Sequence, residues 1–152
     1  MNAAVMTVRL AWPRYDTLTP TGKPSFSKIA GKPLPWLSAN VVNNMRPEEY
    51  RRIKEQWREA AREAAVGQMP HDRVSWHLPF RVDTLIYKRT STPMDSFAVL
   101  EGVKALIDGV VLAGALPDDG PDYVCGGYGR ALKAPDPSLL AVVMTFSEGF
   151  PR

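Results

Sequence analysis

The chain has 152 residues, of which 45% are hydrophobic and 23% charged, which is typical of one folded domain and argues against wholesale disorder. Its net charge of +3 is a mild basic excess that is compatible with nucleic-acid binding without requiring it. One cysteine and two histidines exclude an internal disulfide and a conventional structural zinc site.

The same features predict a cytoplasmic protein with no membrane partner. The lone Cys125 suits a reducing compartment. No run of about 18 apolar residues is present, so no transmembrane helix is expected. Residues 1–12 lack the charged start and the long apolar core of a signal peptide.

The first 46 residues predict a short strand and then a long loop. Residues 7–12 alternate in polarity and end at Pro13, as a strand does. Residues 13–46 form a Pro-rich loop in which four prolines rule out a long regular element: Pro20, Pro24, Pro33 and Pro35. Three lysines make this loop basic, which suits either a solvated loop or a DNA-contacting arm: Lys23, Lys28 and Lys32.

A first main helix is predicted over residues 47–66. Pro47 suits the first helical position, and Glu48 and Glu49 lie at the positive end. Apolar residues then recur at helical spacing, at Tyr50, Ile53, Trp57, Ala60, Ala61 and Ala64. The opposite face carries the candidate nucleic-acid contacts Arg51, Arg52 and Arg58, with glutamates that would form local pairs. This face is therefore either solvated or a phosphate contact.

The second half predicts a strand, a helix and two further strands. Residues 74–89 have two partly apolar faces, as a central strand does, and end in Lys88 and Arg89, two more candidate DNA contacts. Asp95 or Ser96 can cap a second main helix over 96–113. Strands are expected at 123–128 and 139–146. Together these elements predict a single α/β (α+β) domain over residues 1–152, with a mostly antiparallel sheet and two main helices.

Acidic residues flank the second helix, and one lysine lies on it. Asp95 precedes the helix, Lys104 lies within it, and Asp118 and Asp119 follow its end. Such carboxylates could converge on Mg²⁺, which proteins hold through one or two acids together with substrate phosphates. Helical spacing places Lys104 on an apolar stripe with Phe97, Leu100, Ile107 and Val111. Lys104 could then either stabilise charge on a scissile phosphate or simply extend its amine to solvent.

The run from Lys104 to Asp119, KALIDGVVLAGALPDD, resembles the core of the RusA family of Holliday junction resolvases. The family pattern is Asp-x-Asp-Asn entering a helix, then a lysine, an Ala-Gly stop and Asp-Asp. The resemblance implies a small dimeric α/β domain with metal-dependent sites. It implies that Asp95, Lys104 and Asp119 are catalytic, that Asp95, Asp118 and Asp119 hold Mg²⁺ or Mn²⁺, and that branched DNA is the substrate.

One expected ligand is missing from this chain. Phe97 stands where the family has its second Asp, and Ala98 stands where it has Asn. Glu101 lies one turn after Phe97, and its side chain would lean back toward the vacant position. We therefore hypothesise that Glu101 serves as a metal ligand, the alternative being an ordinary surface pair with Lys104.

Two functions follow from this resemblance. The first is a Mg²⁺-dependent endodeoxyribonuclease that resolves Holliday junctions or other branched DNA. The second is a catalytically inactive RusA-like phage protein that binds DNA or a host replication or repair protein. A phage structural role, unrelated to the resemblance, is a third alternative. A homodimer is expected from the resemblance alone, with Trp57 as a candidate for either its interface or the core.

Overall fold

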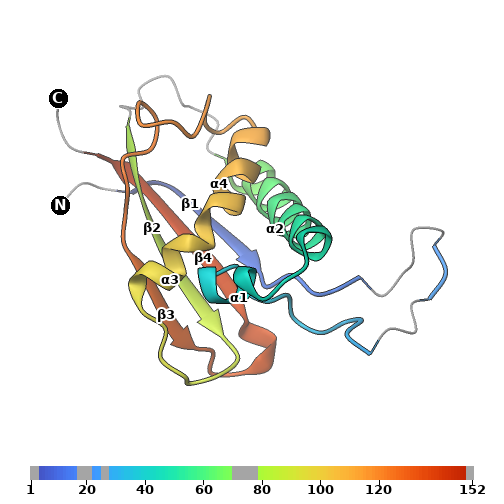
Figure 1. The fold of residues 1–152 in the computed structure, drawn as a ribbon. Coiled ribbons are helices and arrows are strands. Elements are labelled where there is room, and N and C mark those ends of the chain that lie inside the picture. Colours follow the sequence, from blue (N-terminus) through green and yellow to red (C-terminus); the bar gives the residue numbers. More distant parts are fainter. Residues whose placement is uncertain (1–3, 17–21, 25–27, 70–78, 150–152) are drawn as a thin grey trace.

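The structure is a computed structural model that describes residues 4–16, 22–24, 28–69 and 79–149 (Figure 1). Its elements in chain order are β1 (Ala4–Ala11), α1 (Ala39–Asn43), α2 (Pro47–Gln68), β2 (Phe80–Lys88), α3 (Ser96–Glu101), α4 (Val103–Leu112), β3 (Gly129–Lys133), the 3-10 turn η1 (Pro137–Leu139) and β4 (Ala141–Glu148). The mixed α+β class and the order of the main elements are as the sequence predicts. No helix in this described part of the chain is long and apolar enough to cross a membrane.

The four strands form one sheet in the order β1-β4-β2-β3. β4 pairs antiparallel with both β1 and β2, whereas β2 and β3 run parallel. Parallel neighbours need a crossover connection, and α3 and α4 supply it. The mostly antiparallel sheet and the central place of β2 are therefore confirmed.

One face of the sheet is buried beneath the helices, which lie along it in Figure 1. Alternate residues of the three longer strands point into this layer, and they include Val8, Leu10, Val82, Ile86, Val142, Met144 and Phe146. The residues between them on β2 are exposed or half-buried, as the period of two requires. The protein is therefore a two-layer domain whose core lies between the sheet and the helices.

The two longest helices, α2 and α4, pack against each other at a glycine. A Cβ built on Gly109 of α4 would lie 2.2 Å from the Arg58 carbonyl oxygen and 2.9 Å from the Ala61 Cβ, both on α2. Ala61 is itself fully buried. Small residues on both helices therefore allow the close approach that fixes α4 over the core.

Three tryptophans hold the Pro-rich loop against the domain. The indole N–H groups of Trp12 and Trp57 donate to the carbonyls of Leu34 (2.8 Å) and Pro35 (3.0 Å). The Trp36 N–H donates to the Ala98 and Val99 carbonyls, each at 3.1 Å. The three rings lie with centroids 5.1–5.8 Å apart, and Trp57 is only 1% exposed. Trp57 is thus a core residue, and its candidacy for a dimer interface was wrong.

Three details differ from the sequence prediction. The helix expected over 96–113 is divided at Gly102 into α3 and α4. The loop over 13–46 contains the five-residue helix α1. The strand expected at 123–128 is wrong, because regular pairing begins only at Gly129 and the preceding segment forms a single bridge, Phe80 with Val124. Gly126 has φ +111°, and a Cβ on Gly127 would collide with the Val82 carbonyl, so this segment lies against β2 in an irregular conformation. The predicted strand start at 74–78 lies outside the described residues.

Candidate functional site

The chain after α4 reverses and carries Asp119 back to the helix. Gly114 has φ +84°, which only glycine adopts without strain, and its N–H donates to the Val111 carbonyl. Ala115 and Leu116 then insert into the core, where they are 5% and 2% exposed. This burial turns the following residues along the outside of α4.

Lys104 is the point at which the returning segment meets the helix. Its ammonium lies 2.9 Å from Asp108 Oδ1 on the same helix and also contacts Asp119 Oδ2. The Lys104 side chain is 63% exposed, whereas Asp108 and Asp119 are 26% and 25% exposed. We call these three residues the Lys104 cluster. It brings together Lys104 and Asp119, the two residues of the cluster to which the family resemblance assigns catalytic roles.

Lys104 is not on a buried face, however. The predicted apolar stripe holds only in part: Ile107 is buried and Leu100 and Val111 pack partly buried against the core, whereas Phe97 is exposed. The other buried positions are Val99 on α3 and Val103, Ala105, Leu106, Gly109 and Val110 on α4. Nearly every side of this helical segment is apolar, so periodicity alone could not select the face that packs. The charge of Lys104 was the better signal, because a lysine keeps its amine in water.

Asp95 begins α3 as an N-cap. Its Oδ1 accepts a hydrogen bond of 2.9 Å from the Ala98 N–H, which confirms the predicted cap. The helical path breaks at Gly102, where a Cβ would lie 2.4 Å from the Trp36 ring. Trp36 therefore packs into the junction between α3 and α4 and fixes where Asp95 lies.

The remaining predicted ligands have partners of their own. Asp118 Oδ1 accepts from the Asp119 N–H at 2.8 Å, so it stabilises the turn. Glu101 Oε2 accepts from the Ala39 N–H at the start of α1, also at 2.8 Å. The alternative that Glu101 pairs with Lys104 is therefore wrong, and its role as a metal ligand stays a prediction.

The acids do not form a preassembled metal cage. Among the described residues, no group of three or more His, Cys, Asp or Glu side chains could hold a metal ion. The two carboxylates of the Lys104 cluster have oxygen donors of the kind that Mg²⁺ takes from proteins, usually one or two at a time with substrate phosphates. These acids fit Mg²⁺ in donor chemistry, with most of its shell left to water and substrate. His71 and His77 lie outside the described residues.

Phe97, which stands where the family pattern has its second Asp, is exposed to solvent. The Phe97 side chain is 78% exposed on the first turn of α3, two residues after Asp95. Such a position could hold a carboxylate without a burial penalty. The phenyl ring makes no contribution to the core there.

The basic residues predicted to bind nucleic acid lie in two places. On α2, Arg58 pairs with Glu55 while Arg51 and Arg52 are exposed and pair with no acid among the described residues. At the end of β2, the Lys88 ammonium donates to the carbonyls of Thr90 and Thr92 and to the Thr90 hydroxyl. Arg89 is exposed and has no ion-pair partner in the described part of the chain. Arg51, Arg52 and Arg89 are therefore available to an external anion.

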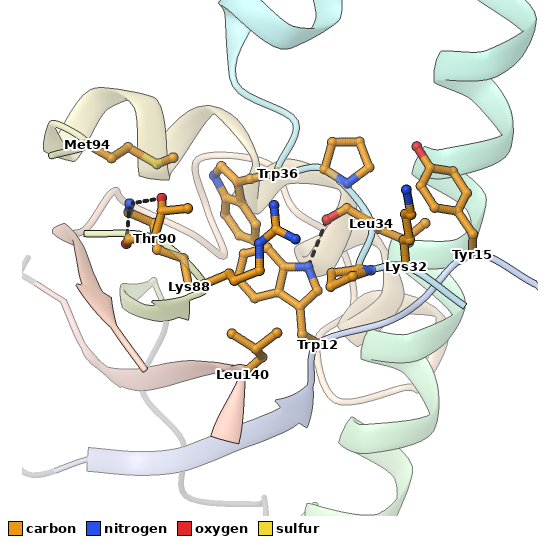
Figure 2. Close-up of a pocket in the computed structure, with 12 residues that line it drawn as sticks. Trp12, Tyr15, Lys32, Leu34, Trp36, Lys88, Thr90, Met94 and Leu140 are labelled. Atoms are coloured by element: carbon orange, nitrogen blue, oxygen red, sulfur yellow. Dashed lines mark hydrogen bonds between the residues drawn. The ribbon is translucent and has the colours of Figure 1, made fainter. Parts of the chain in front are cut away.

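A pocket of about 370 Å³ lies beside α3, and the sequence analysis did not identify it. Its lining consists of Trp12, Tyr15, Lys32, Pro33, Leu34, Pro35, Trp36, Lys88, Arg89, Thr90, Met94 and Leu140. Figure 2 shows Trp12 and Trp36 between Lys88 on one side and Lys32 and Tyr15 on the other. The available signal was the proximity of tryptophans and lysines in the Pro-rich loop, but their convergence depends on the tertiary fold.

No family model, curated protein or solved structure matches this chain. The function of the site is therefore inferred from its own geometry.

Proposed function

We propose that this protein is a RusA-like endodeoxyribonuclease that acts on Holliday junctions or other branched DNA. The observation that carries the proposal is the contact between Lys104 and Asp119, which are brought together from a helix and the segment after it. The motif resemblance assigns catalytic roles to the same two residues. Asp95, at the entrance to the preceding helix, is the third residue that the resemblance assigns.

The chemistry of these side chains suits phosphodiester hydrolysis. The exposed Lys104 ammonium can approach a phosphate and offset the negative charge that develops as the bond breaks. Asp108 and Asp119 position that ammonium in the unbound protein. A phosphate oxygen would take the place of one carboxylate at Lys104 and leave that acid available to a cation.

Asp119 and Asp95 are the residues we assign to Mg²⁺ or Mn²⁺, with Asp118 beside them. The bound ion would supply Lewis acidity and a water of lowered pKa. The hypothesis for Glu101 requires its carboxylate to exchange the Ala39 N–H for the ion.

Arg51, Arg52 and Arg89 are the residues we assign to the DNA backbone, because they are exposed and have no acidic partner among the described residues. A homodimer, which would place two sites on one junction, is part of the proposal. We further propose a cytoplasmic location.

A second candidate is a protein that binds branched DNA, or a host replication or repair protein, without cutting. The exposed Phe97 in the place of an acid and the use of Glu101 as a hydrogen-bond acceptor at α1 favour it. Both features reduce the number of carboxylates available to a metal.

A nuclease assay on a synthetic four-way junction with Mg²⁺ or Mn²⁺, beside a binding assay in EDTA, separates the two. The nuclease predicts strand cleavage that Asp119→Asn and Lys104→Met abolish while binding in EDTA persists. Lys133→Met is the matched control, because Lys133 is an exposed lysine on β3 outside the cluster. Binding without cleavage selects the second candidate.

A further inference from the structure

We propose that the pocket beside α3 binds one unstacked nucleobase of a single-stranded or branch-point nucleotide, with the flanking phosphates held by Lys32 and Arg89. This inference deepens the proposed function, on which its link to branched DNA rests. The pocket lining and its charges support it independently of the Lys104 cluster.

The pocket has the chemistry of a base-stacking site. At about 370 Å³ it lies in the range of small-ligand pockets. Its wall includes the half-buried rings of Trp12 and Tyr15, with Leu34, Met94 and Leu140 around them. Aromatic side chains next to basic ones are how proteins hold single-stranded nucleic acid without reading its sequence.

The rings are fixed before any ligand arrives. The Trp12 N–H donates to the Leu34 carbonyl, so the ring cannot rotate freely, and the ring packs on Trp57 in a T-shaped arrangement with centroids 5.2 Å apart. Trp36 is tied to α3 through the Ala98 and Val99 carbonyls. A base entering the pocket would therefore meet a rigid apolar wall, which lowers the entropy cost of binding.

The charges of the lining select an anion. Three of the lining residues are basic (Lys32, Lys88 and Arg89), and no Asp or Glu is among them. Lys88 is occupied by oxygens of the 90–92 turn, whereas Lys32 and Arg89 are exposed without an acidic partner in the described part of the chain. An apolar pocket flanked by two available cations is complementary to a base with a phosphate on either side.

The surroundings of Tyr15 extend this path toward α2. Burial raises the pKa of the Tyr15 hydroxyl, Glu49 raises it further, and Arg52 opposes both. Glu49 and Arg52 of α2 therefore both act on the Tyr15 end of the pocket. At the other end, Met94 directly precedes Asp95, the cap of α3. A strand crossing the pocket would run between the exposed start of α2 and the entrance to α3.

The test is binding of a short oligothymidine to the full chain in EDTA, followed by tryptophan fluorescence and salt titration. We expect the oligonucleotide to quench the fluorescence, because a base would stack on Trp12. Arg89→Glu and Lys32→Glu should each weaken binding and lower the slope of log K against log salt by about 0.7, the value for one phosphate contact on a single strand. Arg130→Glu is the matched control, since Arg130 is an exposed arginine on β3 outside the pocket.

A second variant tests the stacking itself. Trp12→Ala should weaken oligothymidine binding by about 5- to 150-fold, the effect of removing one base stack. Because Trp12 also packs on Trp57, the unfolding midpoint of Trp12→Ala is measured alongside its binding. If Trp12→Ala fails to fold, the charge variants still test the proposal. Equal binding by the parent, Arg89→Glu and Arg130→Glu, or unchanged fluorescence, would overturn the proposal. So would equally tight, Arg89-dependent binding of polyglutamate, which would identify an anionic peptide as the ligand.

Junctions with and without one unpaired thymine at the crossover separate this inference from the proposed function. Cleavage of both junctions by the parent and by Lys32→Glu alike would leave the nuclease standing and refute the pocket. Lys32-dependent oligothymidine binding without any junction cleavage or preference would support the pocket and refute the nuclease.

Discussion

Restoring the missing acid with Phe97→Asp should increase metal affinity at almost no cost to the fold. The Phe97 side chain is 78% exposed, and surface substitutions of this kind change the free energy of unfolding by no more than about 0.5 kcal/mol. The new carboxylate would lie two residues from Asp95 on the first turn of α3. Under the proposed function it completes the pair of acids that the family pattern places there.

The size of the effect follows from ligand linkage. A metal at 100 times its Kd stabilises the folded state by about 2.7 kcal/mol, and at 10 times by about 1.4 kcal/mol. If the new carboxylate increases Mn²⁺ affinity tenfold, variant and parent should differ by about 1.3 kcal/mol. In a chain of this size that difference corresponds to about 3–5 °C in Tm.

The assay is thermal unfolding with Mn²⁺ and with EDTA, together with junction cleavage. Phe97→Asn is the matched control because asparagine has nearly the same shape as aspartate but carries no charge. We expect a larger Mn²⁺-dependent rise in Tm and faster cleavage for Phe97→Asp, and even more with Ala98→Asn. If Phe97→Asp responds to Mn²⁺ no more than Phe97→Asn does, position 97 is not a metal position and the assignment of Asp95 fails with it. If the parent neither binds Mn²⁺ nor cuts while Phe97→Asp with Ala98→Asn gains both, Glu101 is not a ligand.

Four further predictions concern the helices, the Lys104 cluster, the basic surface and the oligomer. Gly109→Ala should destabilise the fold by about 1–3 kcal/mol in chemical denaturation, because the added Cβ meets the α2 backbone. Gly67→Ala is the control and should be neutral or stabilising, because nothing lies within 4 Å of the added Cβ. Equal effects of the two substitutions would contradict the packing of α2 on α4. Lys104→Met should cost less than about 1 kcal/mol of stability, since its ion pairs are largely exposed, while abolishing cleavage, and undiminished cleavage would remove Lys104 from the mechanism. Arg51→Glu should weaken DNA binding on all sequences alike and reduce its salt dependence, and salt-independent binding would point to a protein partner. Sedimentation should give a dimer at micromolar concentration, and a strict monomer would count against paired cleavage.

The sequence predicts the fold well because local signals and tertiary packing agree. Pro47 begins α2, Asp95 caps α3, and Gly114 reverses the chain after α4, each in the role expected from backbone chemistry. The strand expected at 123–128 was wrong because Gly126 and Gly127 allow a close but irregular approach to β2. Apolar alternation cannot distinguish that approach from regular pairing.

The site was predictable only in part. The return of Asp119 to Lys104 follows from the glycine stop and the buried Ala115 and Leu116, so it was accessible from the sequence. The hydrogen bond of Glu101 was not predictable from the sequence, because its donor is a backbone N–H 62 residues away. The pocket between Lys32 and Arg89 likewise depends on three indole N–H groups that donate to carbonyls of distant segments, and no local pattern encodes these hydrogen bonds.

The proposal that the Lys104 cluster cuts branched DNA can be tested by comparing cleavage of a four-way junction with cleavage of a linear duplex of the same sequence. With Mn²⁺ we predict that the parent protein nicks strands at the junction and leaves the duplex intact, and that Asp119→Asn binds the junction without nicking it. Equal binding to junction and duplex with no nicking of either, or nicking that Asp119→Asn leaves unchanged, would refute the proposed nuclease.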